Sequence, residues 1–283
     1  MTFKDLKYLI LTKTYGFYIN MFAYANAEKA SIKAFELFCR PRRGKIKTDK
    51  IPKILNAFKF ETFEFENQQF QSYIRKGNDE IILLVHGWES NTSRWKKLMP
   101  YLLKTKKTIV AIDAPAHGLS SGIDFTVVHY TKVISAFAKK YNPTIIIGHS
   151  IGGLASIYYQ YLAQNELIKK MIILGAPSDF RVIYNNYCRT LSLNSKVKTE
   201  LEKRFSEKLT MNIDDFSGMK FASAIKTKTL IAHDNSDSVV LIAEGKKTAS
   251  TMPDATFIVT ENLGHAMHDK ILYEKLLSFI LED

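Results

Sequence analysis

Short apolar runs alternate with helical patterns through most of the chain. From about residue 58 the pattern has period two, since Phe63 and Phe65 alternate with polar neighbours and a second alternating segment follows Asn67-Gln68-Gln69. This predicts an antiparallel hairpin with one solvated face. Six later runs are continuously apolar, as expected for parallel strands buried on both faces. They are Ile81–Val85, Thr108–Ile112, Thr144–Ile147, Met171–Leu174, Thr229–Ala232 and Thr256–Val259.

Helical patterns separate the predicted strands. Strand–helix alternation of this kind predicts an α/β fold, with a doubly wound, mostly parallel central sheet and helices on both faces. The helical segments lie near residues 92–104, 125–140, 151–164, 238–250 and 268–281.

One connection, between Leu174 and Thr229, is far longer than the usual loops of α/β proteins. Within it, apolar residues recur every four positions among lysines and glutamates, which predicts an amphipathic helix. We interpret residues 178–226 as a helical insertion over the carboxyl edge of the sheet. Ligands bind at that edge in open α/β sheets, so the insertion is a candidate lid. The recurring residues are Val197, Leu201, Phe205 and Leu209.

Residues 4–39 form a further helical pattern, which Pro41 and Gly44 end. The pattern is apolar on much of the helix circumference, and a helix that is apolar all round is expected to be buried. It can cover the core, contribute to a dimer or lie on a membrane surface. The predicted organisation is therefore a basic helical extension (1–57), a core (58–177 and 227–283) and an insertion (178–226).

The composition fits an ordinary globular protein, with 46% hydrophobic and 24% charged residues among 283. It excludes disordered, collagen-like and low-complexity chains. The two cysteines, Cys39 and Cys188, lie far apart without C-x-x-C spacing. This argues against a disulfide framework or a thiolate zinc site, and it fits a reducing compartment.

The net charge of +12 is concentrated near the N-terminal end. Residues 1–60 hold 13 Lys+Arg against 4 Asp+Glu, whereas the remaining residues hold 27 against 24. The densest cluster, residues 40–47, suits anionic lipid or nucleic acid, but a solvated basic face beside a docking helix is the favoured interpretation. We predict no nucleic-acid partner and keep peripheral membrane contact through this segment as a second hypothesis.

The longest uncharged run near the N-terminal end is Thr14–Ala27. Its 14 residues are too few and too polar to span a membrane. Gly16 and Asn20 interrupt it, which argues against a signal peptide. The sequence therefore predicts a soluble, cytoplasmic protein.

The central chemical signal is the segment Ile145–Leu154, in which a predicted buried strand leads through G-x-S-x-G into a helix. The pentapeptide alone arises by chance in on the order of one in ten chains of this length. Here, however, Gly148 and Gly152 leave room for a sharp turn that raises the Ser150 hydroxyl above the sheet, as in a nucleophile elbow. The Ile151 N–H then lies at the helix start, where it can stabilise an oxyanion.

With this motif, the sequence resembles the α/β-hydrolase fold family from about residue 60 to its C-terminal end. His86-Gly87-Trp88 is similar to the family's H-G-x turn, which implies that the Trp88 backbone N–H is the second donor of the oxyanion hole. Asp113–Ser120 is similar to the family's D-x-P-G-H-G-x-S loop, and it departs at Ala116, where the family has Gly. A positive φ at Ala116 would strain that loop. The resemblance implies structural roles for His117 and Ser120.

The resemblance also implies a catalytic triad in the chain order Ser, Asp, His. Asp237, after the predicted strand that ends at His233, matches the family's position for the orienting acid. Asp234 and Asp179 remain rivals for this role, since each also follows a predicted strand.

The general base implied by the resemblance is His265, in the Gly264-His265 loop after the last predicted strand. His268, one helical turn later, is expected to pack or cap. Two other histidines lie in the motif turns and are expected to support them, while two more receive no role. No histidines have metal-ligand spacing, so no metal is predicted. The supporting pair is His86 and His149, and the pair without a role is His129 and His233.

Together these features imply a serine hydrolase that cleaves a carboxylic ester or thioester through a Ser150 acyl-enzyme and needs no cofactor. The alternatives are carbon–carbon bond hydrolysis or perhydrolysis with the same triad, or a non-catalytic, membrane-recruited binding protein of the same fold. Apolar residues of the insertion favour a small-molecule acyl substrate with an apolar part, although many of them must pack the insertion itself. They are Phe180, Ile183, Tyr184, Tyr187, Phe205, Phe216, Met219 and Phe221. The sequence makes no prediction of oligomeric state.

Overall fold

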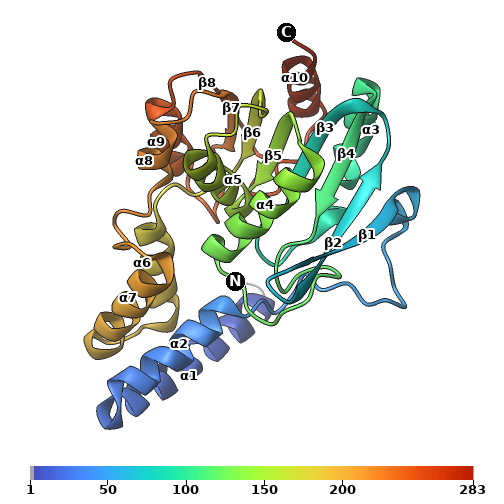
Figure 1. The fold of residues 1–283 in the computed structure, drawn as a ribbon. Coiled ribbons are helices and arrows are strands. Elements are labelled where there is room, and N and C mark those ends of the chain that lie inside the picture. Colours follow the sequence, from blue (N-terminus) through green and yellow to red (C-terminus); the bar gives the residue numbers. More distant parts are fainter. Residues whose placement is uncertain (1–2, 283) are drawn as a thin grey trace. The chain divides into compact units, whose positions relative to one another are not determined.

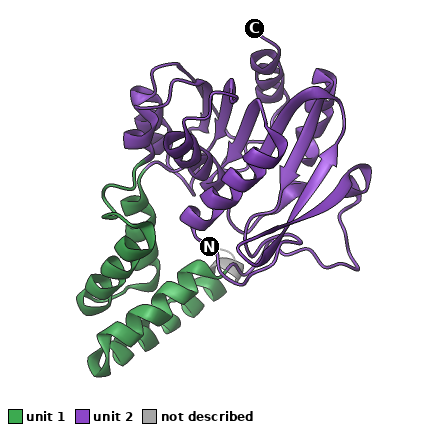
Figure 2. Cartoon of the chain, viewed as in Figure 1, with its two compact units in different colours: residues 1–40, 179–217 green, residues 41–178, 218–283 purple. Residues whose placement is uncertain are grey.

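The computed structural model describes residues 3–282, which form two compact units (Figure 2). Unit 1 combines the described residues up to Arg40 with Asp179–Ser217, and unit 2 contains Pro41–Ser178 and the chain from Gly218 onward. The structure thus groups the N-terminal helices with the helices of the insertion. Compared with the predicted ranges, residues 41–57 and 218–226 lie in unit 2.

Unit 2 is built around one eight-stranded sheet with the strand order β1-β2-β4-β3-β5-β6-β7-β8 (Figure 1). The predicted hairpin is β1 with β2, and β2 also pairs antiparallel with β4. All other neighbours pair in parallel, as predicted from the continuous apolar runs. The strands are β1 (Lys59–Phe65), β2 (Gln68–Arg75), β3 (Asn78–Val85), β4 (Lys107–Ile112), β5 (Ile145–His149), β6 (Lys170–Leu174), β7 (Lys228–Asp234) and β8 (Ala255–Thr260).

Helices cover both faces of this sheet, which explains why its central strands are continuously apolar. All four residues from Ile82 to Val85 are fully buried, although successive side chains point to opposite faces. On one face, α10 and the segment 92–105 pack against Ile82 and Leu84. Helices α4 and α5 pack against each other and contact β3 (Figure 1). The helices of unit 2 are α3 (Met99–Leu102), α4 (Val127–Tyr141), α5 (Ile151–Ala163), α8 (Gly218–Ala222), α9 (Ile242–Thr251) and α10 (Lys270–Leu281), with a short 3₁₀ helix η1 (Lys53–Ala57).

The single helix predicted near residues 92–104 is wrong in detail. The segment forms a 3₁₀ helix η2 (Thr92–Lys97), the short α3 and a second 3₁₀ turn η3 (Leu103–Thr105). Pro100 lies at the start of α3. Because proline has no N–H and its ring clashes with the preceding turn, one continuous helix cannot run through Pro100. A proline is tolerated in the first turn of a helix, and α3 accordingly begins at Met99.

Unit 1 contains two pairs of helices. The structure divides the predicted helix 4–39 at Asn26, whose backbone is extended (φ −158°) and whose side chain caps the second helix by accepting the Lys29 N–H. Asparagine favours such a cap over a helix interior because its side chain competes for backbone groups. The helices are α1 (Phe3–Ala25), α2 (Ala27–Cys39), α6 (Phe180–Leu191) and α7 (Ser195–Leu209).

The amphipathic helix predicted in the insertion is α7, and its four recurring apolar residues are buried. Aromatic rings of the insertion pack within unit 1: Phe180, Phe205 and Tyr187 each contact Phe38 of α2. Phe216 is fully buried beside Phe180. These rings form the core of unit 1, and this packing accounts for much of the apolar character that the sequence suggested for a substrate-facing roof.

Helix α1 contradicts the expectation of burial. From Leu6 to its end, where burial is described, only Gly16, Ile19 and Ala23 of α1 are buried, although most of the helix is apolar. Gly16 allows a close approach to α6, since a Cβ there would lie 1.7 Å from the Leu191 carbonyl oxygen. Among residues 3–282, no helix combines the length and apolar character needed to cross a bilayer.

Candidate active site

Ser150 lies at a strained turn between β5 and α5. Its φ of 56° and ψ of −130° are unfavourable for a residue with a side chain, so the surrounding backbone must impose them. The two flanking glycines permit this. A Cβ on Gly148 would lie 2.7 Å from the Gly153 Cα, and one on Gly152 would lie 2.3 Å from the His86 carbonyl oxygen. The turn predicted from G-x-S-x-G is therefore present.

Three predicted site residues are joined by hydrogen bonds. His265 Nε2 lies 3.0 Å from Ser150 Oγ, and His265 Nδ1 lies 2.8 Å from Asp237 Oδ2. With its proton on Nδ1, the ring donates to Asp237 and accepts the Ser150 hydroxyl. Asp237 is buried, whereas part of the His265 side chain is exposed. This arrangement can transfer the hydroxyl proton to the imidazole and stabilise the resulting imidazolium.

The remaining contacts of Asp237 hold its carboxylate in place. Oδ1 accepts the backbone N–H groups of Val239 (2.8 Å) and Val240 (2.9 Å). Burial alone would raise the pKa of Asp237, but the hydrogen bonds from His265 and these two N–H groups outweigh it and lower the pKa. Asp237 is therefore ionised at neutral pH and oriented toward the imidazole.

The two rival acids have other contacts. Asp234 accepts the N–H groups of Leu263 and Gly264, each at 3.0 Å, and thereby ties β7 to the loop that carries His265. Asp179 accepts the Ser217 hydroxyl at 2.6 Å within unit 1. Of the three candidates, Asp237 has the hydrogen bond to His265.

The segment His86-Gly87-Trp88 passes directly beside Ser150. A Cβ on Gly87 would lie 2.8 Å from the Ser150 Cβ, so only glycine allows this approach. The Trp88 ring is anchored against His117 and Phe125, with centroid distances of 5.4 and 5.3 Å. Ile151 is the first residue of α5, where a backbone N–H has no acceptor within the helix. Both predicted oxyanion donors thus belong to backbone that borders Ser150.

The Asp113–Ser120 loop forms hydrogen bonds with the segment that contains His86 and with the adjacent Glu89. His86 donates from Nδ1 to the Gly87 carbonyl (2.8 Å) and accepts the Ala114 N–H at Nε2 (3.0 Å). His117 donates to Pro115 and accepts the Glu89 N–H. These bonds agree with the structural role expected for His117. The strain expected at Ala116 is also present, since its φ is 63°.

These two imidazoles make stability depend on pH. Burial lowers the pKa of His86 and of His117 to about 4, whereas an unfolded chain binds these protons near pH 6.5. The free energy of unfolding is therefore at its full value above about pH 6.5 and falls as the pH drops toward 4. We expect a loss of several kcal/mol, roughly 1.4 kcal/mol per unit of pKa shift and histidine. Urea denaturation at about pH 7 and pH 4.5 measures it, and equal stabilities at both would contradict it.

Two histidines contribute more than the sequence indicated. His149 donates from Nε2 to the His265 carbonyl at 2.8 Å, which holds the backbone of the predicted base. His233, given no role from sequence, donates to the Val240 carbonyl at 2.8 Å and so supports the turn that carries Asp237. In the sequence, the position of His233 at the end of the strand before Asp237 was the available signal for this role. Its acceptor, the Val240 carbonyl, could not be predicted because it depends on how the intervening turn folds.

Part of the basic cluster at residues 40–47 is engaged by unit 2. Arg42 contacts Glu89 (3.2 Å), and Lys45 donates to the Ser120 carbonyl (2.6 Å). Gly44 accepts the Gly118 N–H. These contacts join the cluster to Glu89 and to the Asp113–Ser120 loop.

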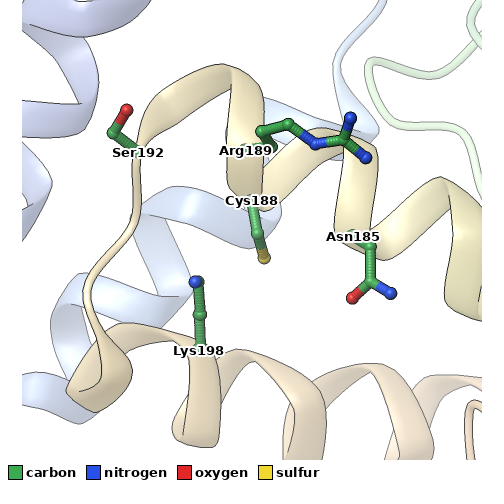
Figure 3. Close-up of a pocket in the computed structure, with 5 residues that line it drawn as sticks. All are labelled: Asn185, Cys188, Arg189, Ser192 and Lys198. Carbon is green, nitrogen blue, oxygen red and sulfur yellow. The ribbon is translucent and has the colours of Figure 1, made fainter.

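A cavity of about 430 Å³ lies within unit 1 between α6 and α7 (Figure 3). Cys188 and Lys198 face it from the two helices, and Arg189 is another of its lining residues. Burial raises the pKa of the Cys188 thiol, which keeps it protonated and makes it a poor nucleophile. Among the described residues, no group of three or more His, Cys, Asp or Glu side chains is placed to hold a metal ion.

Comparison with known proteins identifies the same fold. A model of the α/β-hydrolase fold matches residues 80–195. The human serine hydrolase-like protein is 33% identical over 102 residues, which cover 34% of this chain and 49% of that protein. This chain thus spans about half the length of that curated relative, and the match to the human serine hydrolase-like protein 2 covers 32% of its length.

Solved structures show the same fold. The thioesterase domain from the curacin biosynthetic pathway superposes with a TM-score of 0.59 at 17% identity, covering 80% of this chain and all of that domain (100%). An esterase from a Rhodococcus species gives a TM-score of 0.59 at 15% identity, covering 79% of this chain and 98% of that one.

The sheet order and the strand–turn–helix at Ser150 are those of the α/β-hydrolase fold. The chain has the α/β-hydrolase fold, and its sequence match to the model of that fold covers residues 80–195.

Proposed function

We propose that the protein is a serine hydrolase that cleaves a carboxylic ester or thioester. The observation that carries this proposal is the unbroken hydrogen-bonded path from Ser150 through His265 to Asp237, which begins at the hydroxyl of a residue with strained backbone. The names of the relatives, serine hydrolase-like proteins, favour the same chemistry.

In the proposed reaction, His265 Nε2 takes the proton from Ser150 Oγ as the oxygen attacks the acyl carbon. Asp237 holds the imidazole in the required tautomer and stabilises the imidazolium. The Trp88 and Ile151 N–H groups stabilise the tetrahedral oxyanion. His265 then protonates the departing alcohol or thiol, and water hydrolyses the acyl-enzyme by the same route. Every step is an addition, an elimination or a proton transfer, so the proposed mechanism uses no cofactor.

The alternatives remain outcomes of the same test. Carbon–carbon bond hydrolysis and perhydrolysis use the same serine, histidine and aspartate, and they differ in the substrate. A non-catalytic protein of this fold has no need for a strained serine in contact with a histidine that is itself paired with a buried carboxylate, which favours an active enzyme.

The test is labelling of the whole protein with a fluorophosphonate, followed by mapping of the modified peptide. One adduct on the peptide that contains Ser150 is expected. Hydrolysis of nitrophenyl esters of graded acyl chain length, measured in parallel, is expected to be detectable and to identify the preferred acyl length. Absence of an adduct, or an adduct on another residue, would contradict the proposal.

A further inference from the structure

Helix α1 exposes a concentrated apolar surface. Half of the exposed large apolar side chains of the described residues belong to this one helix, each with 40–69% of its surface exposed. Isolated exposed residues of this kind are ordinary, but a concentration of them on one element indicates an interaction site. We call this set the α1 face. It consists of Leu6, Tyr8, Leu9, Ile10, Leu11, Tyr15, Phe17, Tyr18, Met21 and Tyr24.

The α1 face runs along the helix because α1 is held to unit 1 by one narrow stripe. Gly16, Ile19 and Ala23 lie three or four residues apart and therefore on one side of the helix. Ile10, Phe17 and Met21 are spaced by seven and four residues, so they form a row on the other side. The helix can therefore lie flat along an apolar layer while its buried stripe stays in unit 1.

The polar groups of α1 are compatible with loss of water. The Thr12 hydroxyl donates to the Tyr8 carbonyl, and the Thr14 hydroxyl donates to the Ile10 carbonyl, each at 2.9 Å. Neither donor needs water when the face is covered, so the usual cost of burying a hydroxyl is reduced. Four members of the face are tyrosines, which combine an apolar ring with a polar tip and suit the boundary between acyl chains and water.

Basic side chains lie at both ends of this face. Lys7 is exposed near the first turns, and the Lys196 ammonium lies 4.8 Å from the centre of the Tyr24 ring near the last. Residues 1–40 hold six Lys+Arg against three Asp+Glu, a net charge of +3. Lysines that border an apolar helix face are attracted to anionic lipid headgroups. In a pair of identical copies, antiparallel packing would instead bring Lys7 of each copy toward Lys196 of the other.

We propose that α1 is an interfacial helix that seats unit 1 on an anionic phospholipid surface. The side of the α1 face that carries Ile10, Phe17 and Met21 enters the boundary of the acyl chains, with the helix axis parallel to the surface. Lys7 and Lys196 contact the headgroups. This places the membrane contact on α1 rather than on the basic cluster at residues 40–47, whose Arg42 and Lys45 are engaged within unit 2. The inference does not depend on the proposed hydrolase activity.

The test is co-flotation of the full chain with vesicles of phosphatidylglycerol and phosphatidylcholine in equal parts, and with phosphatidylcholine alone. The parent protein is expected to bind the anionic vesicles, and added salt is expected to weaken binding because it screens the headgroup charge. Replacing Ile10, Phe17 and Met21 together by serine is expected to lower the partition coefficient about 100-fold, since three apolar side chains no longer enter the layer.

A matched control replaces three apolar side chains of unit 2 with similar exposure, Ile123, Leu167 and Ile271, by serine. It is expected to bind like the parent. A second pair of variants tests charge: Lys7→Glu with Lys196→Glu is expected to weaken binding at least about tenfold. Lys76→Glu with Lys226→Glu, at exposed positions of unit 2, is expected to change it little. Thermal melting of each variant shows that it is folded.

Equal binding by the parent and the Ile10, Phe17 and Met21 variant would overturn the proposal, as would equal binding to both kinds of vesicle. Light scattering tests whether the α1 face instead joins two copies of the chain. If the parent is a dimer that the same variant converts to a monomer, and it binds neither vesicle, the α1 face joins two copies and the lipid proposal is wrong.

Discussion

Replacing Ser150 by alanine is expected to abolish fluorophosphonate labelling and to lower ester turnover by about four to six orders of magnitude. The hydroxyl is the only group of the proposed triad that forms a covalent bond to the acyl carbon. Without it, His265 and Asp237 can at most assist attack by water, while the oxyanion donors still provide their smaller contribution. The measurements are the mass of the labelled protein and kcat for a nitrophenyl ester.

Ser156→Ala is the matched control for this variant. Ser156 is a buried residue of α5, the helix that follows Ser150. Its hydroxyl donates to the Gly152 carbonyl at 2.7 Å. Its loss removes one hydrogen bond without touching the proposed nucleophile, so labelling and kcat should stay close to those of the parent. If Ser150→Ala still becomes labelled, another residue is the nucleophile and the proposed mechanism is wrong.

Replacing Asp237 by asparagine is expected to lower kcat about 10⁴-fold while leaving the fold intact. The geometry of the carboxylate gives the reason. The Val239 and Val240 N–H groups require an acceptor at Oδ1, so the amide oxygen of an asparagine takes that place. Its NH2 group then faces His265 Nδ1 and donates to it, which moves the ring proton to Nε2. In that tautomer the imidazole cannot accept the Ser150 proton.

Asp179→Asn is the matched control, because Asp179 was a rival for the same role and its contact is with Ser217. Its kcat is expected to remain within a few-fold of the parent. The assignment of the acid would be overturned by a loss in Asp179→Asn as large as that in Asp237→Asn. Circular dichroism and melting temperatures of both variants separate a catalytic effect from unfolding.

The sequence predicted the parts of this protein that depend on local pattern. The six continuous apolar runs lie in the parallel strands β3 to β8, because a strand buried on both faces favours apolar side chains at successive positions. The expected burial is wrong for β8, the edge strand, which is only partly buried. The turn at Ser150 was predictable for a similar reason. A side chain at Gly148 would clash with the backbone of Gly153, and one at Gly152 would clash with the backbone of His86. Both positions therefore require glycine, and the sequence shows this as the G-x-S-x-G motif.

The acid could not be settled from sequence alone. Asp234, Asp237 and Asp179 each follow a strand, and a difference of three residues within one turn decides which carboxylate meets the imidazole. In the structure, Asp237 accepts a hydrogen bond from His265. Asp234 instead accepts two backbone N–H groups of the loop that carries His265. The role of His233 could not be predicted from sequence either, because its acceptor, the Val240 carbonyl, lies beyond a turn whose conformation has no local sequence pattern.

The sequence by itself thus determined the succession of strands and helices and the sharp turn at Ser150, because both follow from the spacing of apolar residues and glycines, while the candidates for the partners of Ser150 came from the resemblance to the α/β-hydrolase family. Only the tertiary structure decided which carboxylate pairs with His265, that the N-terminal helices belong with the insertion in one unit, and that the apolar α1 is exposed. Those features depend on contacts between residues distant in the chain, and an apolar helix has the same sequence pattern whether protein, lipid or a second copy covers it.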